Sequence, residues 1–280
     1  MLIPVVLSSD AHYAKFMGVT ILSCLLSASR DDELHFYILD GGILAEDRKK
    51  LEGMAERFHA KMTFIAMDGD LFSGLKLDIR PDNHHVTIAS YYRLFISSLV
   101  PEDKCIYLDC DMLVFRSLSG LLGTDLGGSI AAGVPDLGED SSSERLGLHA
   151  YVNAGMLLMD LAAMRDLHIQ EAFLDFIRKN PEKLVYHDQD VINSVLDGKI
   201  AKLDKRWNVQ ICKTRKCRET GFHALRKNAF ILHFIGHRKP WHRRCKTPER
   251  LLYWQYLQKS PWAEAPLAHA WHVLLSFFRI

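Results

Sequence analysis

The chain has 280 residues, with 35 basic and 34 acidic side chains and a formal net charge of +1. Hydrophobic residues make up 48% of it and charged residues 25%, which excludes a disordered chain, and the balanced total excludes a wholly basic nucleic-acid-binding protein. The length fits one large α/β domain or two small ones.

The N-terminal quarter alternates between strand patterns and helix patterns. Strands are predicted over Leu2–Leu7, His35–Leu39 and Met62–Met67, and helices over residues 13–28 and Glu46–Phe58. This alternation predicts a parallel sheet with helices on both faces. The first strand is not followed by a Gly-x-Gly-x-x-Gly motif, and the sequence contains no phosphate-binding P-loop motif.

The middle of the chain continues with further strands and helices. Helices are predicted over residues 87–99 and Ile169–Arg178, and strands over Cys105–Leu108 and Ile130–Val134. Residues 137–149 are polar and rich in serine, so we expect a long mobile loop of the kind that forms lids or binding loops.

Two aspartates follow the strand over Cys105–Leu108, in the run Asp109-Cys110-Asp111. In extended backbone, residues two apart point to the same face, and ligands bind at the carboxyl ends of strands in open α/β sheets. Two adjacent carboxylates repel each other unless a cation lies between them, and Mg²⁺ or Mn²⁺ binds carboxylate together with phosphate oxygens. The alternative is a pair of solvated turn carboxylates.

Two later segments carry further candidates. A short apolar strand is followed by a glycine and a lysine, in the order His233, Gly236 and Lys239. His233 could bind a metal, Gly236 would allow a ligand to approach the backbone closely, and Lys239 could contact a phosphate. The alternative is a core histidine and a surface lysine. The run Asp188-Gln189-Asp190 precedes an apolar helix, where Asp188 is placed to cap the helix. This run has two interpretations that stay equally open. Its acidic residues either stabilise the N-terminal end of the helix through the helix dipole, or they take part in catalysis.

These motifs, in this order, resemble the retaining glycosyltransferases of family 8, especially the bacterial galactosyl- and glucosyltransferases of lipooligosaccharide and lipopolysaccharide synthesis. The resemblance also rests on Tyr91-Tyr92-Arg93-Leu94 and on Tyr151-Val152-Asn153-Ala154-Gly155-Met156, and it extends from the first strand to about Trp241. It implies a GT-A-type nucleotide-sugar fold, with a mostly parallel central sheet flanked by helices. The implied transferase domain spans residues 1–245, and a helical, basic and aromatic appendage spans residues 246–280.

The resemblance implies roles for individual residues. Contacts with the nucleotide sugar are implied for Ser8, Asp10, Tyr13, Arg93, Asp109, Cys110, Asn153, Ala154, Gly236 and Lys239. A Mn²⁺ or Mg²⁺ ion would be held by Asp109, Asp111 and His233, and the catalytic candidates are Asp188, Gln189 and Asp190. The chain departs from the family's pattern in Ser9-Asp10-Ala11-His12, where that pattern has paired aspartates and an asparagine.

The implied reaction is a metal-dependent transfer of galactose or glucose from a UDP-hexose to a glycan or lipid-linked glycan, with retention of configuration, in lipopolysaccharide, lipooligosaccharide or capsule synthesis. The alternatives are a self-glucosylating or UDP-sugar-hydrolysing member of the same fold and a non-enzymatic nucleotide-binding protein. Residues 136–149 match the family poorly, so the acceptor does not carry over. We expect no nucleic-acid partner, because no nucleic-acid-binding module is recognisable.

Basic and aromatic residues gather in the last third of the chain. Residues 1–201 carry 18 basic and 30 acidic side chains, whereas residues 202–250 carry 15 basic and 3 acidic ones. Four of the five tryptophans lie in the last 40 residues. This composition predicts peripheral contact with a membrane through the C-terminus, and a helix packed on the domain is the alternative.

The N-terminus and the cysteines bear on the compartment. The apolar run after Met1 is too short for a signal peptide, and no run approaches the roughly 20 apolar residues of a membrane span. The six cysteines lack the paired spacing of a zinc site. We therefore expect a cytoplasmic protein with reduced thiols, at the inner face of the cytoplasmic membrane if the C-terminus binds lipid.

Overall fold

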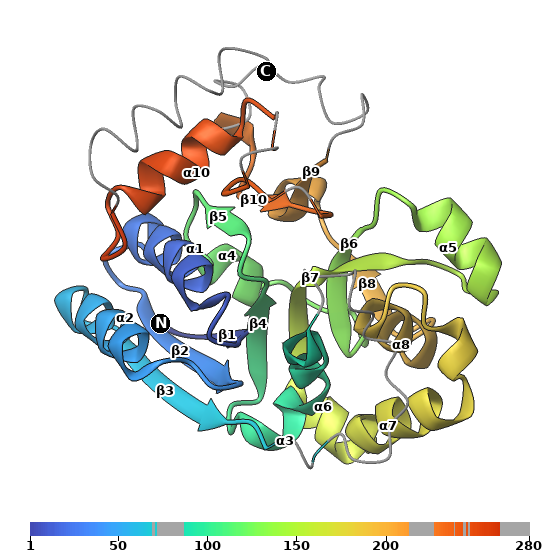
Figure 1. Ribbon diagram of the computed structural model, residues 1–280. Coiled ribbons are helices and arrows are strands. Elements are labelled where there is room, and N and C mark those ends of the chain that lie inside the picture. Colours follow the sequence, from blue (N-terminus) through green and yellow to red (C-terminus); the bar gives the residue numbers. More distant parts are fainter. Residues whose placement is uncertain are drawn as a thin grey trace.

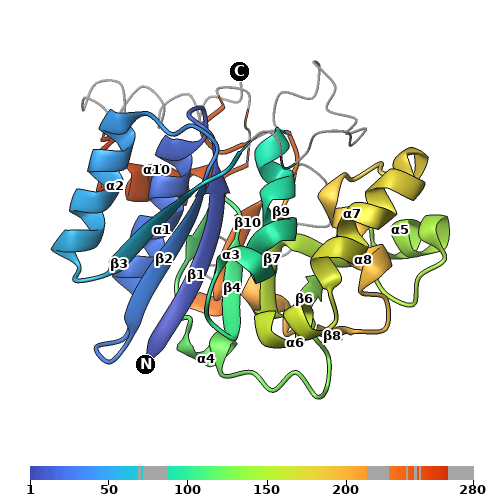
Figure 2. The ribbon, with the colours of Figure 1, turned by 90° about the horizontal axis from the view of Figure 1, so that it is seen from below.

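A computed structural model describes residues 1–68, 71, 87–212, 227–237, 239–242, 245 and 247–263. Its centre is a 7-stranded sheet in the order β3-β2-β1-β4-β7-β6-β8 (Figures 1 and 2). The strands are β1 (Leu2–Ser9), β2 (Glu33–Asp40), β3 (Lys61–Ala66), β4 (Lys104–Leu108), β6 (Ala131–Pro135), β7 (Val152–Asp160) and β8 (Ile200–Lys202). Strand β7 runs antiparallel to β4 and β6, and all other neighbours in this sheet are parallel. The predicted mostly parallel sheet is confirmed.

Helices cover both faces of this sheet, as predicted. Alternate side chains of β1 point to opposite faces: Ile3, Val5 and Leu7 pack with one group of helices, and Val6 packs with the other. The first group is α1 (Ala14–Ser27), α2 (Ala45–Arg57) and α4 (Ser119–Leu122). The second is η2 (Ile88–Phe95), α3 (Ile96–Leu99), α6 (Leu161–Asp166), α7 (Ile169–Lys179) and α8 (Asp188–Val195). Short 3-10 helices η3 (Pro181–Lys183) and η4 (Lys205–Asn208) connect later elements.

A second sheet brings the end of the chain back to the strand that follows the Asp-Cys-Asp run. It consists of β5 (Met112–Val114), β10 (Ile231–Phe234) and β9 (Val209–Ile211), in the order β5-β10-β9. Strand β10 is antiparallel to β5, and His233 lies opposite Met112. This register sets His233 beside Asp111, although the two residues are far apart in sequence.

Helix α10 (Arg250–Leu257) packs on this second sheet and on α1. Its residues Leu252, Tyr253 and Trp254 form a buried cluster with Val19 of α1 and Leu232 of β10. The described part of the predicted appendage is therefore in contact with the domain. Residues 264–280, including Trp271, lie outside the described residues. None of the helices in the described part of the chain is both long and apolar enough to cross a membrane.

The predicted loop over residues 137–149 is wrong, because the structure has a helix there, α5 (Glu139–Leu146). The helix begins with Glu139 and Asp140, whose charges suit the N-terminal end of the dipole. It ends at Gly147, which takes the left-handed conformation (φ 70°) that favours glycine. These end signals outweigh the weak helix propensity of the serines between them.

Two hydroxyl groups of α1 stand in for a neighbouring strand along the free edge of β5. The Thr20 hydroxyl lies 2.9 Å from the Cys110 carbonyl oxygen and 3.0 Å from that of Met112, and it accepts a hydrogen bond from the Met112 N–H at 3.2 Å. The Ser23 hydroxyl accepts one from the Val114 N–H at 2.8 Å. Thr20 and Ser23 are fully buried, so they fix β5, and with it Asp111, against α1.

We expect Thr20→Val to lower the free energy of unfolding by about 1–3 kcal/mol, because it leaves buried backbone groups without a partner. Urea unfolding measures this change. The matched control is Thr63→Val on the exposed face of β3, for which we expect a change within about 0.5 kcal/mol. Equal losses in the two variants would contradict the role given to the Thr20 hydroxyl.

Candidate active site

An open pocket lies at the carboxyl ends of β1 and β4. Eight of the predicted site residues line it: Ser8, Asp10, Tyr13, Arg93, Asp109, Cys110, Asp111 and Lys239. They come from the ends of β1 and β4, from η2 and from the segment after β10. The fold therefore brings together residues that are dispersed over most of the sequence.

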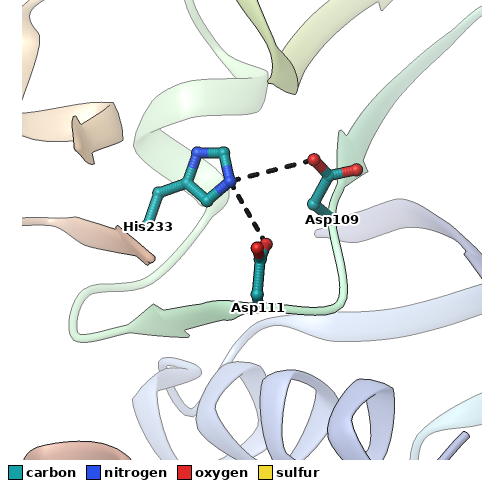
Figure 3. Close-up of side chains that lie close together, drawn as sticks. All are labelled: Asp109, Asp111 and His233. Atoms are coloured by element: carbon teal, nitrogen blue, oxygen red, sulfur yellow. Dashed lines mark ion pairs between the residues drawn. The ribbon is translucent and has the colours of Figure 1, made fainter. Parts of the chain in front are cut away.

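Asp109 and Asp111, which line this pocket, form a compact group with His233, which is not among the lining residues (Figure 3). His233 Nε2 lies 3.2 Å from Asp111 Oδ1 and 3.8 Å from Asp109 Oδ2, and one ligand atom from each residue lies within 4.8 Å of the others. Asp111 Oδ1 is buried and accepts no hydrogen bond from any described residue. An unsatisfied buried acceptor beside an imidazole and a second carboxylate fits a divalent cation such as Mn²⁺ or Mg²⁺.

The imidazole of His233 is oriented for such a role. Its Nδ1 lies 3.1 Å from Asn208 Oδ1, which can only accept, so Nδ1 carries the proton and the Nε2 lone pair faces the carboxylates. Gly155 leaves the room that this group needs. A Cβ atom at that position would lie 2.4 Å from His233 Cε1 and 2.7 Å from Asp109 Oδ2.

Lys239 stands on the other side of Asp111. Its ammonium group donates to Asp111 Oδ2 and to the Phe234 carbonyl oxygen at 3.1 Å. Burial acts to raise the pKa of Asp111, but the charge of Lys239, the largest opposing cause, holds that pKa well below its usual range. Asp111 is therefore ionised across the physiological pH range.

Arg93, buried at the end of η2, ties three elements together. Its guanidinium donates to Asp109 Oδ1 at 2.7 Å and to the Ala154 carbonyl oxygen at 2.7 Å, and its Nε lies 3.0 Å from Asp188 Oδ2. It also lies over the Tyr107 ring, 4.3 Å from the centroid. Burial disfavours its charge, but Asp109 and Asp188 raise the pKa of Arg93 above its usual value. Arg93 thus sets the position of both carboxylates.

The side chains of Asp188, Gln189 and Asp190 enter three different environments. Asp188 pairs with Arg93; burial, the largest cause, raises its pKa to about 6, and Arg93 opposes that rise. Gln189 Oε1 accepts from the Ala154 N–H at 3.0 Å and from Asn153 Nδ2 at 3.3 Å.

Asp190 faces away from Arg93, and none of its surface is exposed. It accepts hydrogen bonds from Arg145 at 2.7 Å, from the Tyr151 hydroxyl at 2.5 Å and from the Tyr186 N–H at 2.7 Å. The prediction that Asp188 caps α8 is wrong, because the cap position belongs to His187 and Asp188 is the first helical residue. His187 (φ 54°, ψ −126°) has a left-handed backbone that turns Asp188 toward Arg93.

The remaining predicted residues lie at the edges of this arrangement. Asp10 Oδ1 accepts from the Tyr13 N–H at 3.2 Å, which caps the turn into α1. Burial, followed by the charge of Asp111, raises the pKa of Tyr13 well above its usual value. Cys110 Sγ donates to the Ser8 carbonyl oxygen at 3.1 Å. Gly236, with φ 78°, is not among the residues that line the pocket.

Two residues that the sequence did not point to belong to the same network. Asn208 Nδ2 donates to Asn153 Oδ1 at 2.9 Å, and Asn153 Nδ2 donates to Asp136 Oδ2, also at 2.9 Å. Gln189 Nε2 lies 3.4 Å from the same Asp136 oxygen. Asp136 follows β6 directly, as Asp109 follows β4, so its place at a strand end was a usable signal. Asn208 carries no such signal, because only the return of β9 and β10 sets it beside His233.

Comparisons with known proteins point to one family. The family model for Glycosyl transferase family 8 matches residues 4–245. General stress protein A of Bacillus subtilis (strain 168) is 29% identical over 273 residues, which cover 92% of this chain and 94% of that protein. Lipopolysaccharide 1,2-glucosyltransferase of Escherichia coli (strain K12) is 28% identical over 267 residues, which cover 91% of this chain and 77% of that enzyme.

The solved structures include galactosyltransferase LgtC in complex with donor and acceptor sugar analogues. This chain superposes on it with a TM-score of 0.80 at 25% sequence identity, and the alignment covers 96% of this chain and 100% of that one.

We expect Gly155→Ala to weaken Mn²⁺ binding at least about tenfold, or about 1.4 kcal/mol, because the added methyl group pushes against two of the three ligand side chains. Titration calorimetry with Mn²⁺ measures this. The control is Gly120→Ala, whose Cβ would meet the Trp207 ring at an ordinary 3.7 Å and should leave Mn²⁺ affinity unchanged. A folded Gly155→Ala protein with wild-type Mn²⁺ affinity would argue against this metal site.

Asp188 should make stability depend on pH in a defined window. A carboxyl whose pKa is raised from 3.8 to about 6 binds its proton more tightly in the folded state. The free energy of unfolding should therefore fall as the pH rises through this range, by roughly 3 kcal/mol between about pH 4 and pH 6. Urea unfolding of the wild type and of Asp188→Asn, with a chelator present, should show the variant gaining stability relative to the wild type across that window. A constant difference would contradict the shifted pKa.

Proposed function

The chain belongs to glycosyltransferase family 8, has a GT-A-type fold and is a glycosyltransferase; on this premise we propose a metal-dependent, retaining transfer of galactose or glucose. The donor would be a UDP-hexose, and the acceptor a glycan or lipid-linked glycan of lipopolysaccharide, lipooligosaccharide or capsule synthesis. The observation that carries the proposal is the convergence of Asp109, Asp111 and His233, with Lys239 beside Asp111, at the pocket that the two aspartates and Lys239 line. Carboxylates backed by fixed cations suit a metal-bound diphosphate better than an uncharged ligand.

Asp109, Asp111 and His233 would hold the ion. A divalent cation there would supply Lewis-acid stabilisation of the diphosphate leaving group. Lys239 lies on the same wall of the pocket and is fixed by Asp111 and the Phe234 carbonyl oxygen, so it offers a preorganised positive charge. Such a charge lowers the barrier where negative charge develops as the bond to the anomeric carbon breaks.

The sugar would be oriented by groups that are already held in place. Asp188 is locked by Arg93, and Asn153 by Asp136 and Asn208. Side chains fixed in this way lose little conformational freedom when they bind hydroxyl groups, which is a positioning contribution to catalysis. Asp136, close to Gln189 and Asn153, is well placed to extend this polar surface toward an acceptor.

For the retaining step we propose attack from the face of the leaving group, without a covalent intermediate on the Asp188-Gln189-Asp190 run. Gln189 is a neutral amide and a poor nucleophile. Asp190 is fully buried and already accepts three hydrogen bonds, and Asp188 is paired with Arg93. Gln189 would instead help to orient the donor sugar, because its side chain is held in place by Asn153 and by the Ala154 N–H.

The division into a transferase domain (residues 1–245) and an appendage (246–280) stays a prediction, as does peripheral contact of the C-terminus with a membrane. A cytoplasmic enzyme at the inner face of that membrane would meet both UDP-sugars and lipid-linked acceptors. The relative named as a lipopolysaccharide glucosyltransferase supports this class of acceptor.

The central experiment is a donor screen with UDP-galactose, UDP-glucose and UDP-N-acetylglucosamine, with and without Mn²⁺, that measures UDP release and transfer to an added glycan. We expect turnover of one of the first two donors, and only with the metal. Asp111→Asn should abolish it, because it removes a ligand charge; Asp103→Asn, at an exposed position before β4, is the matched control. Full metal-dependent activity of Asp111→Asn would refute the metal assignment. UDP release without glycan product would favour the hydrolytic or self-glucosylating alternative.

Gln189→Ala should lower turnover at least about tenfold while the affinity for UDP stays unchanged, because Gln189 contacts Asn153 and Ala154 and not the carboxylates that face the diphosphate. Steady-state kinetics and UDP titration separate these effects. A parallel loss of UDP affinity would place Gln189 in the nucleotide site.

A further inference from the structure

A second pocket lies away from the active site, between α2 and the segment that follows α10. Both helices pack against α1, on the same side of the molecule (Figure 1). This pocket and the active-site pocket share no lining residue among those described. Its function is therefore not explained by the proposed transfer reaction.

The rim of this pocket is basic. Four cationic side chains line it: Lys49, Lys50 and Arg57 of α2, and Lys259 after α10. Lys50 lies 3.3 Å from Asp47, whereas the other three pair with no carboxylate in the described part of the chain. Glu46, Glu52 and Glu56, the other acidic residues of α2, are not among the lining residues. Cations that line one pocket repel each other, and a bound anion would relieve this repulsion.

The floor of the pocket is apolar. It is formed by Leu22 of α1, Met54 and Phe58 of α2, and Pro261. Basic groups beside apolar side chains suit a ligand that carries a phosphate on a hydrocarbon body, because a free phosphate ion has no apolar surface to bury against those side chains.

Gly53 opens the wall between the basic rim and the apolar floor. It lies inside α2, where glycine stabilises a helix less than alanine does. A Cβ atom at Gly53 would have no neighbour within 4 Å, so packing does not require the glycine. The missing side chain widens the pocket at the point where Lys49 and Arg57 flank it one helical turn away on either side.

The opposite wall is held in place by Trp262. Its indole N–H donates to Asp47 at 2.7 Å, and its ring lies against Gly18, where a Cβ atom would come within 2.2 Å of it. Lys50 lies 5.6 Å from the centroid of the same ring. The pocket is therefore bounded by two fixed elements.

We propose that this pocket binds the phosphate headgroup of an anionic membrane lipid, with the phosphate at Lys49, Arg57 and Lys259 and the adjoining hydrocarbon against Phe58 and Pro261. The full-length protein would then contact a membrane through α2 and the end of α10. This contact does not depend on the identity of the sugar donor, so its failure and that of the proposed transfer reaction are distinguishable.

The test is co-sedimentation of the full chain with vesicles of phosphatidylcholine and phosphatidylglycerol, and with vesicles of phosphatidylcholine alone. We expect binding only to the first. Lys49→Ala/Arg57→Ala should weaken it about 25-fold, because each basic residue near an anionic surface contributes about fivefold. The matched control Lys199→Ala/Lys205→Ala removes the same charge from exposed positions outside the pocket and should change binding less than about twofold.

A second pair of variants tests the pocket itself at constant charge. Gly53→Gln should fill it and weaken binding, whereas Gly53→Ala should bind as the wild type does. Thermal melting confirms that all variants are folded. Wild-type binding by Lys49→Ala/Arg57→Ala, an equal loss in the control pair, or no binding by the wild type would overturn the proposal. Displacement from the vesicles by inorganic phosphate at constant ionic strength would also overturn it, in favour of a site for the free anion.

Discussion

The repulsion between Asp109 and Asp111 is the constraint on which the candidate active site depends. Asp111 is 5% exposed, so water does little to screen its charge. Each carboxylate is balanced by its own cation, Arg93 for Asp109 and Lys239 for Asp111. Counting Asp188 as ionised at neutral pH and His233 as neutral, three carboxylates face two cations. The group thus carries a formal charge of −1, which a divalent cation would change to +1. The same pocket that attracts the metal would then attract a diphosphate.

The fold meets this constraint through its second sheet. Strand β5 starts directly after Asp111, and β10 pairs with it so that His233 lies opposite Met112. Lys239 follows β10 and reaches Asp111 from the other side. On its remaining edge β5 is held by the hydroxyl groups of Thr20 and Ser23. The position of one carboxylate is thus determined by three segments that are distant in sequence.

Much of this could be predicted from the sequence where the signal is local. The alternation of short apolar strands with longer helical segments located β1 to β4, α1 and α2, because these elements are marked by local sequence patterns. Prediction failed at α5 although its signals are local, because the serine-rich composition of segment 137–149 outweighed the helix-end residues in the interpretation. It failed at Asp188 because a tertiary contact decides there: Asp188 pairs with Arg93 instead of capping α8. The antiparallel direction of β7 and the contact between Asn208 and His233 depend on how the chain returns, which no local pattern encodes.

The distribution of charge shows the same limit. The basic stretch over residues 202–250 predicted either an anionic partner or packing against the acidic part of the chain. Both apply to Lys239: it pairs with Asp111, and it lines the pocket in which we expect a diphosphate to bind. Lys202 simply packs, since it pairs with Glu139 at 2.7 Å. Conversely, the cations around Gly53 belong mostly to the acidic part of the chain, where a count by segment hides them. An anion site depends on which charges converge without a counter-charge, and only the folded chain reveals that.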